Sequence, residues 1–261
     1  MGIVSNLRRY AAVTGLVAAV AMVSTAALAA GDAKHPEERD WQFDGIFGTV
    51  DVHSAQRGLQ VYLEVCSGCH ALKHVAYRNL GALGFTESEI KAIAAEFEVT
   101  DGPDNEGEMF QRPAIASDHF VSPFPNEEAA KAANNGANPP DLSLQVKVHA
   151  SGADYIRALL TGYADAPEGV EVPEGSNYNP FYRGGFIAMP QPLFEDGVEY
   201  SDGTAATVDQ MATDVVNFLQ WTAEPEMQQR KKTGFKVVIF LLILSALLYA
   251  GKRKLWANID H

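Results

Sequence analysis

The spacing of apolar residues along the chain predicts a small number of amphipathic helices. Between Ala55 and Val65, apolar side chains recur three and four positions apart, which is the period of one helix face. The same spacing predicts helices over Ser88 to Phe97 and Val208 to Trp221, and a shorter one over Asp154 to Thr161. No segment shows the alternation of a strand, so we expect a mainly α-helical fold.

Loops rich in proline, glycine and asparagine separate these segments. The stretch from Asn134 to Pro140 (NNGANPP) is the clearest of them, because its residues favour turns and interrupt helices. We therefore expect a few helices joined by long irregular loops.

The first thirty residues have the features of an export signal. Arg8 and Arg9 precede an apolar run, and Ala27-Leu28-Ala29 has the small-x-small form of a cleavage site. An N-terminal anchor is the alternative, but the run is short for a bilayer span of about 20 residues. We expect residues 1–30 to be a signal peptide that is removed.

A second apolar segment lies near the C-terminus, and its length indicates a membrane span. Val237 to Ala250 would extend about 21 Å as a helix, whereas residues 233–251 would extend about 28 Å, close to a hydrocarbon core of about 30 Å. Lys and Arg clusters flank both ends, which is unusual for a buried core helix. We expect a transmembrane helix over residues 233–251.

The topology is inferred from the predicted signal peptide. Basic residues flank both sides of the span, so the positive-inside rule gives almost no information on its orientation. Residues 31–229 would form a domain in the periplasm or an equivalent organellar compartment, on the outer side of the inner (cytoplasmic) membrane. Residues 252–261 would form a cytoplasmic tail.

The charge of the predicted exported domain is strongly negative. The whole chain has a net charge of −13, but residues 31–229 carry eleven Lys and Arg against thirty-two Asp and Glu, a net charge near −21. Acidic runs cluster from Glu96 to Glu108 and from Asp165 to Glu174. This balance argues against nucleic-acid binding and would attract a basic soluble partner.

Both cysteines of the chain lie in one motif, Cys66-Ser67-Gly68-Cys69-His70. A disulfide across two residues would restrain little of the unfolded chain, and a zinc site would need further ligands at a matched spacing. A thioredoxin-like pair would need a strand and a βαβ pattern, which are missing. Two thiols followed by a histidine instead favour covalent attachment of one haem c, with His70 as the proximal iron ligand.

The second iron ligand is less clear from the residues alone. A high-potential carrier favours a methionine opposite the histidine. Met211 fits core packing and Met227 lies beside the anchor, which leaves Met109 and Met189. Met189 is favoured because nearby glycines permit close approach and Pro190 stiffens the loop. His119 and His149 are rival ligands.

The motifs together resemble those of the cytochrome c1 family, the haem subunits of cytochrome bc1 complexes in alphaproteobacteria and mitochondria. The resemblance runs from about Trp41 to Trp256. It includes RGLQVYLEVCSGCHALKHVAYRNL, DGPDNEGEMFQRPAIASDHF, AAKAANNGANPPDLS, DYIRALLTGY, FIAMPQPLF and DGTAATVDQMATDVVNFLQWTAEPE. Its order of motifs is far more specific than the CxxCH motif alone.

The resemblance implies a c-type cytochrome (class I-like) haem domain with long irregular loops and one C-terminal transmembrane helix. It implies thioether bonds to Cys66 and Cys69, His70 and Met189 as the iron ligands, and no role for Met109. It also implies six haem-pocket residues: Asn134, Pro139, Pro140, Tyr155, Leu159 and Ile187. Where the family usually has an arginine for a haem propionate, this chain has His149, with Lys147 nearby, so either could replace it.

The implied activity is that of an electron-transfer subunit of ubiquinol–cytochrome c reductase. Such a subunit takes one electron from the Rieske iron–sulfur protein and reduces a cytochrome c, within a membrane complex that includes cytochrome b and is expected to be dimeric. No residue would act as an acid, base or nucleophile. The alternatives are an independent membrane-anchored c-type shuttle and a haem enzyme such as a peroxidase, which needs an open distal site.

Overall fold

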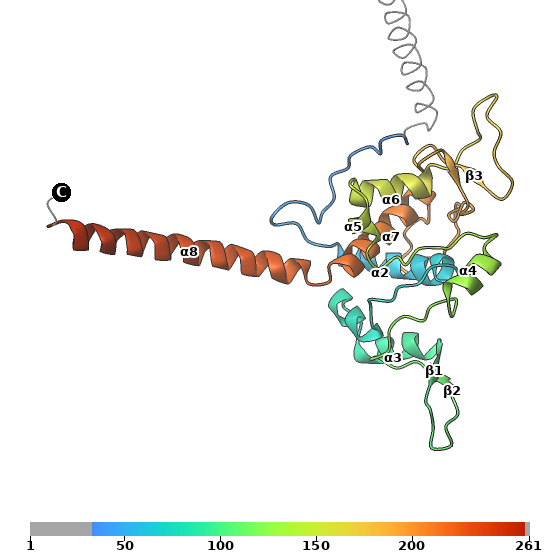
Figure 1. The fold of residues 1–261 in the computed structure, drawn as a ribbon, viewed down its shortest axis with the longest axis horizontal. Coiled ribbons are helices and arrows are strands. Elements are labelled where there is room, and N and C mark those ends of the chain that lie inside the picture. The colour runs from blue at the N-terminus through green and yellow to red at the C-terminus, as the bar shows by residue number, and fades with distance from the viewer. Residues whose placement is uncertain (1–32, 259–261) are drawn as a thin grey trace, which may run out of the picture.

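A computed structural model of the chain describes residues 33–258. A mainly helical domain carries one long helix, α8, that projects from it (Figure 1). The predicted signal peptide lies outside the described residues. The helices are α2 Val52–Val61, η2 Tyr62–Cys66, η3 Tyr77–Leu83, α3 Glu87–Ala95, α4 Glu127–Ala133, α5 Gln145–Val148, α6 Gly152–Thr161, α7 Val208–Ala223 and α8 Met227–Trp256.

Helices α2 and α7 form the centre of the domain. Asp51 caps α2 by accepting a hydrogen bond from the Ser54 N–H at 3.1 Å, and Thr207 caps α7 in the same way through the Gln210 N–H. The buried face of α2 includes Ala55, Gly58 and Leu59, and it packs on a face of α7 that is buried over most of its length. Both amphipathic predictions are confirmed.

Gly58 lets the backbones of these two helices touch. A methyl group at Gly58 would lie 2.0 Å from the backbone carbonyl oxygen of Asp214 and 2.7 Å from the Phe218 Cβ. Neither atom is the flexible end of a side chain. Only glycine therefore fits this crossing.

We predict that Gly58→Ala lowers the free energy of unfolding by about 1–3 kcal/mol, because the added methyl must push α2 away from α7. Chemical denaturation of the full chain in detergent measures this change. Gly81→Ala is the matched control, since its methyl group would lie no closer than 3.8 Å to any neighbour. Equal losses in the two variants would contradict the prediction.

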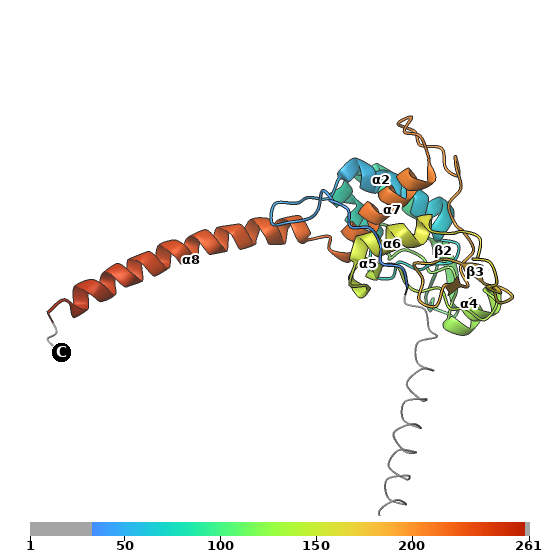
Figure 2. The same cartoon turned by 90° about the horizontal axis from the view of Figure 1, so that it is seen from above.

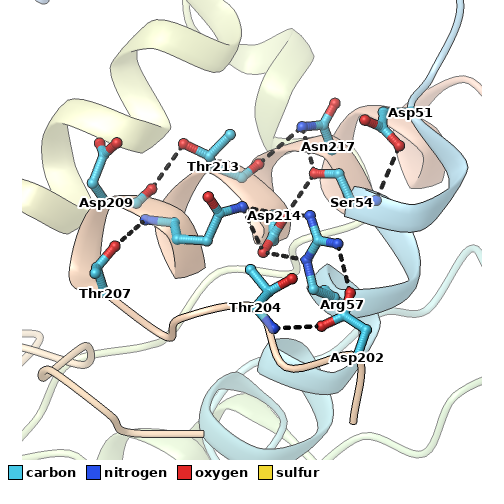
Figure 3. A network of polar contacts seen from close by, with 11 residues as sticks. Asp51, Ser54, Arg57, Asp202, Thr204, Thr207, Asp209, Thr213, Asp214 and Asn217 are labelled. Atoms are coloured by element: carbon cyan, nitrogen blue, oxygen red, sulfur yellow. Dashed lines mark hydrogen bonds and ion pairs between the residues drawn. The ribbon is translucent and has the colours of Figure 1, made fainter. Parts of the chain in front are cut away.

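A buried polar network joins the same two helices (Figure 3). The Asp214 carboxylate of α7 is fully buried and accepts hydrogen bonds from Ser54 Oγ at 2.7 Å and from Arg57 Nε at 2.9 Å, both on α2. Gln210 Nε2 approaches both carboxylate oxygens at 3.1 Å. Arg57 also binds Asp202 at 3.0 Å.

Two short antiparallel hairpins correct the expectation that strands are absent. Strand β1 (Glu98–Asp101) pairs with β2 (Phe110–Pro113), and β3 (Asn177–Tyr178) pairs with β4 (Phe186–Ile187). Each pair is too short for hydrophobic alternation to show in the sequence. Three further short helices, η3, α4 and α5, have too few turns to show a helical period.

Helix α8 is a 30-residue helix that includes the whole predicted span and extends beyond both ends. Both views show that it projects away from the domain (Figures 1 and 2). Its most apolar 18-residue window has a mean hydropathy of 2.2 and is not buried within the described structure. By length and composition, α8 can cross a membrane.

Candidate functional site

The CxxCH motif follows α2 through a widened turn. The residues Tyr62–Cys66 form a π-helical turn, in which the Ser67 N–H donates to the Tyr62 carbonyl five residues earlier, at 2.8 Å. The N–H groups of Cys69 and His70 then both donate to the Cys66 carbonyl, at 3.1 and 2.9 Å. Single π-turns inside helices often mark functional sites, and this one brings the whole motif into one compact turn.

Both cysteines are free thiols at the surface of this turn. Cys66 is half-buried and Cys69 is exposed. Burial raises the pKa of the Cys66 thiol to about 12, with a smaller contribution from Cys69. A redox dithiol needs a thiolate with a lowered pKa, so this environment does not suit thioredoxin-like chemistry.

The His70 ring has a fixed orientation. Its Nδ1 lies 2.8 Å from the Pro140 carbonyl oxygen, and because a carbonyl only accepts, Nδ1 carries the proton. Burial lowers the pKa of His70, while the Pro140 carbonyl opposes that shift, so the ring is neutral. Nε2 therefore keeps its lone pair on the opposite side of the ring, as an iron ligand requires.

The loop that contains Pro140 is attached to the chain that follows the motif. The Asp141 carboxylate accepts from the Lys73 N–H at 2.8 Å and from the Ser143 N–H at 2.9 Å. The Leu142 N–H donates to the Ala71 carbonyl at 2.9 Å. These bonds hold the Pro140 carbonyl in place beneath His70.

Tyr62 supports the motif from the other side. Its hydroxyl donates to the His70 carbonyl at 3.1 Å, and its buried ring packs against Phe120 and Phe218 at centroid distances of 5.9 and 5.7 Å. The aromatic core therefore connects directly to the backbone of His70.

Met189 is half-buried on a loop whose backbone is held by two side chains. Its carbonyl accepts from the Tyr163 hydroxyl at 3.1 Å and from Asn177 Nδ2 at 3.2 Å. Asn177 also pairs with Ile187 in the β3–β4 ladder. These two hydrogen bonds hold the backbone of Met189 in place.

The Met189 loop is fixed to α6 through a buried asparagine. Asn179 is fully buried, its Nδ2 donates to the Leu159 carbonyl at 2.8 Å, and its N–H donates to the Gly185 carbonyl at 2.8 Å. Gly185 has a φ of +79°, a conformation that favours glycine, and a methyl group there would lie 3.2 Å from the Tyr178 ring. The predicted pocket residue Leu159 thus also supports the predicted ligand loop.

The other predicted pocket residues lie on three different elements. Asn134 ends α4, where its Nδ2 donates to the Ala130 carbonyl at 2.8 Å, and Pro139 is half-buried in the following loop. Tyr155 is half-buried on α6, and Ile187 is buried on β4. Two groups of residues make up this site: His70 with Tyr62 and Pro140, and Met189 with Tyr163 and Asn177. Within residues 33–258, no hydrogen bond or ring contact joins the first group to the second.

His149 and Lys147 have different surroundings. The His149 ring stacks on the Tyr155 ring at a centroid distance of 4.0 Å, and burial lowers its pKa, so it is neutral. Lys147 instead pairs with Glu224 at 2.8 Å, and Glu224 also binds Arg230 of α8 at 2.6 Å. Of these two residues, only His149 contacts a predicted pocket residue, Tyr155.

A groove of about 1040 Å³ lies in another part of the described structure. It is lined by the segment from His35 to Gly45, by the region around His149, and by the start of α8. Neither the two cysteines nor His70 and Met189 line it. In the part of the chain that the structure covers, no cluster of three His, Cys, Asp or Glu side chains suits a bare metal ion.

Sequence reasoning missed the residues that orient the two predicted ligands. Tyr62 has a place in the amphipathic pattern, but its bond to His70 is not visible there. Tyr163 and Asn177 lie 26 and 12 residues before Met189, and no pattern connects them.

Comparisons with known proteins show which family the chain resembles over most of its length. A protein-family model described as the Cytochrome C1 family matches residues 41–259. The protein "Cytochrome c1, heme protein, mitochondrial" from Schizosaccharomyces pombe is 50% identical over 251 residues, covering 95% of this chain and 82% of its own. "Cytochrome c1" from Rhodospirillum rubrum is 50% identical over 240 residues, covering 86% and 88%.

A third relative carries a name that mentions an assembly. The "Cytochrome b-c1 complex catalytic subunit, mitochondrial" from Candida albicans is 50% identical over 255 residues, covering 95% of this chain and 88% of its own. The family match covers the CxxCH turn, the Met189 loop and all of α8 together. The chain therefore belongs to the cytochrome c1 family.

Proposed function

We propose that this protein is the haem-bearing electron-transfer subunit of a ubiquinol–cytochrome c reductase. Membership of the cytochrome c1 family supports a haem c protein of a cytochrome bc1 complex rather than an independent shuttle. The structural observation that carries the proposal is the orientation of His70. Directly after two free thiols, it presents Nε2 while Pro140 holds Nδ1.

The residues present fit one covalent haem c. Cys66 and Cys69 would each add an S–H across one vinyl group, which forms a thioether and places the thiol proton on the vinyl carbon. His70 and Met189 would bind the iron, and Asn134, Pro139, Pro140, Tyr155, Leu159 and Ile187 would line the ring. When bound, the haem supplies a one-electron iron couple.

This chain's own residues orient and protect the group rather than move protons. Pro140 and Tyr62 hold His70 from two directions, and Tyr163 and Asn177 hold the Met189 backbone. Fixed ligands change little between two oxidation states, so the reorganisation that opposes electron transfer stays small.

The electron partners follow from this proposal. The Rieske iron–sulfur protein would donate one electron, and a basic cytochrome c would accept it, with cytochrome b as the membrane partner in a dimeric complex. Two acidic loops suit a basic acceptor: the β1–β2 loop exposes Asp104, Glu106 and Glu108, and the loop after α6 exposes Glu168, Glu171 and Glu174. Both loops stand away from the helices in Figure 1.

The proposed location is the inner membrane, crossed once by α8. The domain before Met227 would face the periplasm or an equivalent compartment, and the residues after the helix would face the cytoplasm. The proposed boundaries are residues 31–229 for the domain, 233–251 for the span and 252–261 for the tail.

A reduced-minus-oxidised spectrum of the purified membrane complex tests the function. We expect haem b and haem c bands together, a co-purifying iron–sulfur centre, and reduction of the haem c by quinol. A haem c protein that purifies without b-type haem would support an independent shuttle and contradict the proposal. A haem that readily binds peroxide would support a haem enzyme.

We predict that Met189→Leu removes the weak red absorption band of a methionine-ligated ferric haem and lowers the midpoint potential, because a thioether favours ferrous iron. Absorbance spectroscopy and redox titration measure both effects. Met109→Leu is the control, since Met109 is 59% exposed on the β1–β2 loop. An unchanged spectrum in Met189→Leu would refute the ligand assignment.

We predict that His149→Arg raises the midpoint potential by on the order of tens of millivolts, because a new cation near the ring stabilises the ferrous state. The wild-type ring is neutral and stacks on Tyr155. His149→Gln separates the loss of the ring from the gain of charge. A potential that is identical in both variants would place His149 away from the haem.

A further inference from the structure

A tight loop beside the start of α8 exposes two large apolar side chains. Ile46 and Phe47 are 75% and 73% exposed at its tip. The loop is closed at its base by the Thr49 N–H, which donates to the Gln42 carbonyl at 3.0 Å. The exposed tip therefore belongs to an ordered, hydrogen-bonded turn.

The sequence of the loop favours this shape. Gly45 has a φ of +69°, and a methyl group at Gly48 would lie 2.0 Å from the Asp44 carbonyl oxygen, so the backbone returns on itself. Next to the tip, Trp41 and Phe43 stack at 5.3 Å and are buried. Aromatic side chains point inward from the base, whereas Ile46 and Phe47 point away.

The loop is attached to α8 by both polar and apolar contacts. Lys231 Nζ donates to the carbonyl oxygens of Phe43 and Gly48 at 2.7 and 3.0 Å. The Phe47 ring meets the Phe235 ring edge-on at 5.9 Å. Figures 1 and 2 both show this blue segment running alongside the start of the helix.

The position along α8 gives the depth of the tip. Phe235 lies two residues inside the domain-side end of the proposed span 233–251. Two residues correspond to about 3 Å of helix at about 1.5 Å per residue, so Phe235 is near the end of the hydrocarbon core. Phe47, which contacts Phe235, therefore lies at the boundary nearest the domain.

A small hollow between the loop and the helix combines ammonium groups with apolar side chains. It is about 200 Å³, and its lining combines Lys231 and Lys232 with the apolar side chains of Ile46, Phe47 and Phe235. Ammonium groups beside an apolar surface match a phosphate headgroup above an acyl chain.

We propose that the loop from Asp44 to Gly48 is a second membrane contact, which inserts Ile46 and Phe47 into the outer interface of the bilayer beside α8. The loop and the lysine contacts fix the angle of the domain against the membrane, so the domain cannot rotate freely on a single helix. The inference rests on the proposed membrane span of α8.

Spin labelling of the membrane complex, reconstituted into vesicles of zwitterionic and anionic phospholipid, tests the proposal. Ile46→Cys carries a nitroxide, and attachment is selective because Cys66 and Cys69 are taken up in the proposed thioethers. We expect the ratio of oxygen to nickel-chelate accessibility to be several-fold higher at position 46 than at Ile115→Cys. Ile115 is 54% exposed and follows β2, across the domain from α8 (Figure 1).

The remaining outcomes each overturn the proposal in a distinct way. A label at position 46 that is open to the nickel chelate places the loop in water. A label that is shielded from both reagents places it under a partner protein. Leu244→Cys, near the middle of α8, distinguishes failure of the loop proposal from failure of the proposed membrane span. A label at position 244 that is accessible to the nickel chelate would refute the span itself.

Discussion

Replacing Cys66 and Cys69 together with serine will produce a chain without covalent haem. Serine lacks the thiol that adds to a vinyl group, so no thioether can form at either position. The readout is in-gel haem staining after denaturation, which detects only covalent attachment. We expect complete loss of stain in the double variant and retention of one thioether in each single variant.

The matched control is Ser67→Ala, which lies between the two cysteines. Its Oγ donates to the Leu63 carbonyl at 2.7 Å, so the substitution removes a local hydrogen bond but no thiol. We expect normal haem stain in this variant. Stain in the double serine variant would mean that the motif does not attach the haem, and the functional assignment would fail with it.

Replacing Asp214 with alanine will destabilise the domain by about 3–5 kcal/mol, since it removes the buried carboxylate that pairs with Arg57 and leaves this largely buried arginine only the half-exposed Asp202. Arg57 makes two hydrogen bonds to this carboxylate, at 2.9 and 3.0 Å. Asp214 is fully buried, so water cannot replace the lost charge. Chemical denaturation of the haem-loaded chain in detergent measures the loss.

Asp209→Ala is the control on the same helix. Asp209 pairs with Arg157, but its side chain is 53% exposed, so its loss costs about 0–1 kcal/mol. A double-mutant cycle with Arg57→Met then separates the Arg57 pair from the bonds to Ser54 and Gln210. Similar losses for Asp209→Ala and Asp214→Ala would show that burial of the pair contributes nothing.

The Asp214 network also connects the two ends of the proposed electron carrier. Helix α2 continues directly into the CxxCH turn, and α7 leads through Glu224 into α8 (Figure 1). The same crossing therefore fixes the CxxCH turn relative to the start of α8. A destabilised crossing should loosen both together.

Several elements could be predicted from local pattern. Helices α2, α3, α6 and α7 each bury one face, so their apolar residues recur with the helical period, and the structure confirms them within a few residues. Helix α8 could be predicted from the length and apolar composition of its segment. The CxxCH motif could be recognised without the fold, because it is defined by five adjacent residues.

Other features depended on contacts that no local pattern contains. The two strands of the β1–β2 hairpin have four residues each, with Val99 and Phe110 as their large apolar side chains, so they show no clear hydrophobic alternation. Asp214 looks like one more polar residue on α7, yet it is buried because Ser54 and Arg57, some 160 residues earlier, supply its partners. Burial of a charge is a property of the assembled pair.

The sequence by itself determined the helical class, the long apolar helix and the candidate motif for haem attachment, because each follows from residues close together in the chain. Only the tertiary structure decided how the candidate ligands are held. Pro140 reaches His70 from 70 residues away, and Tyr163 reaches the Met189 carbonyl from another element. Hydrogen bonds of that range form only after the loops have closed, and their geometry is set by the packing around them.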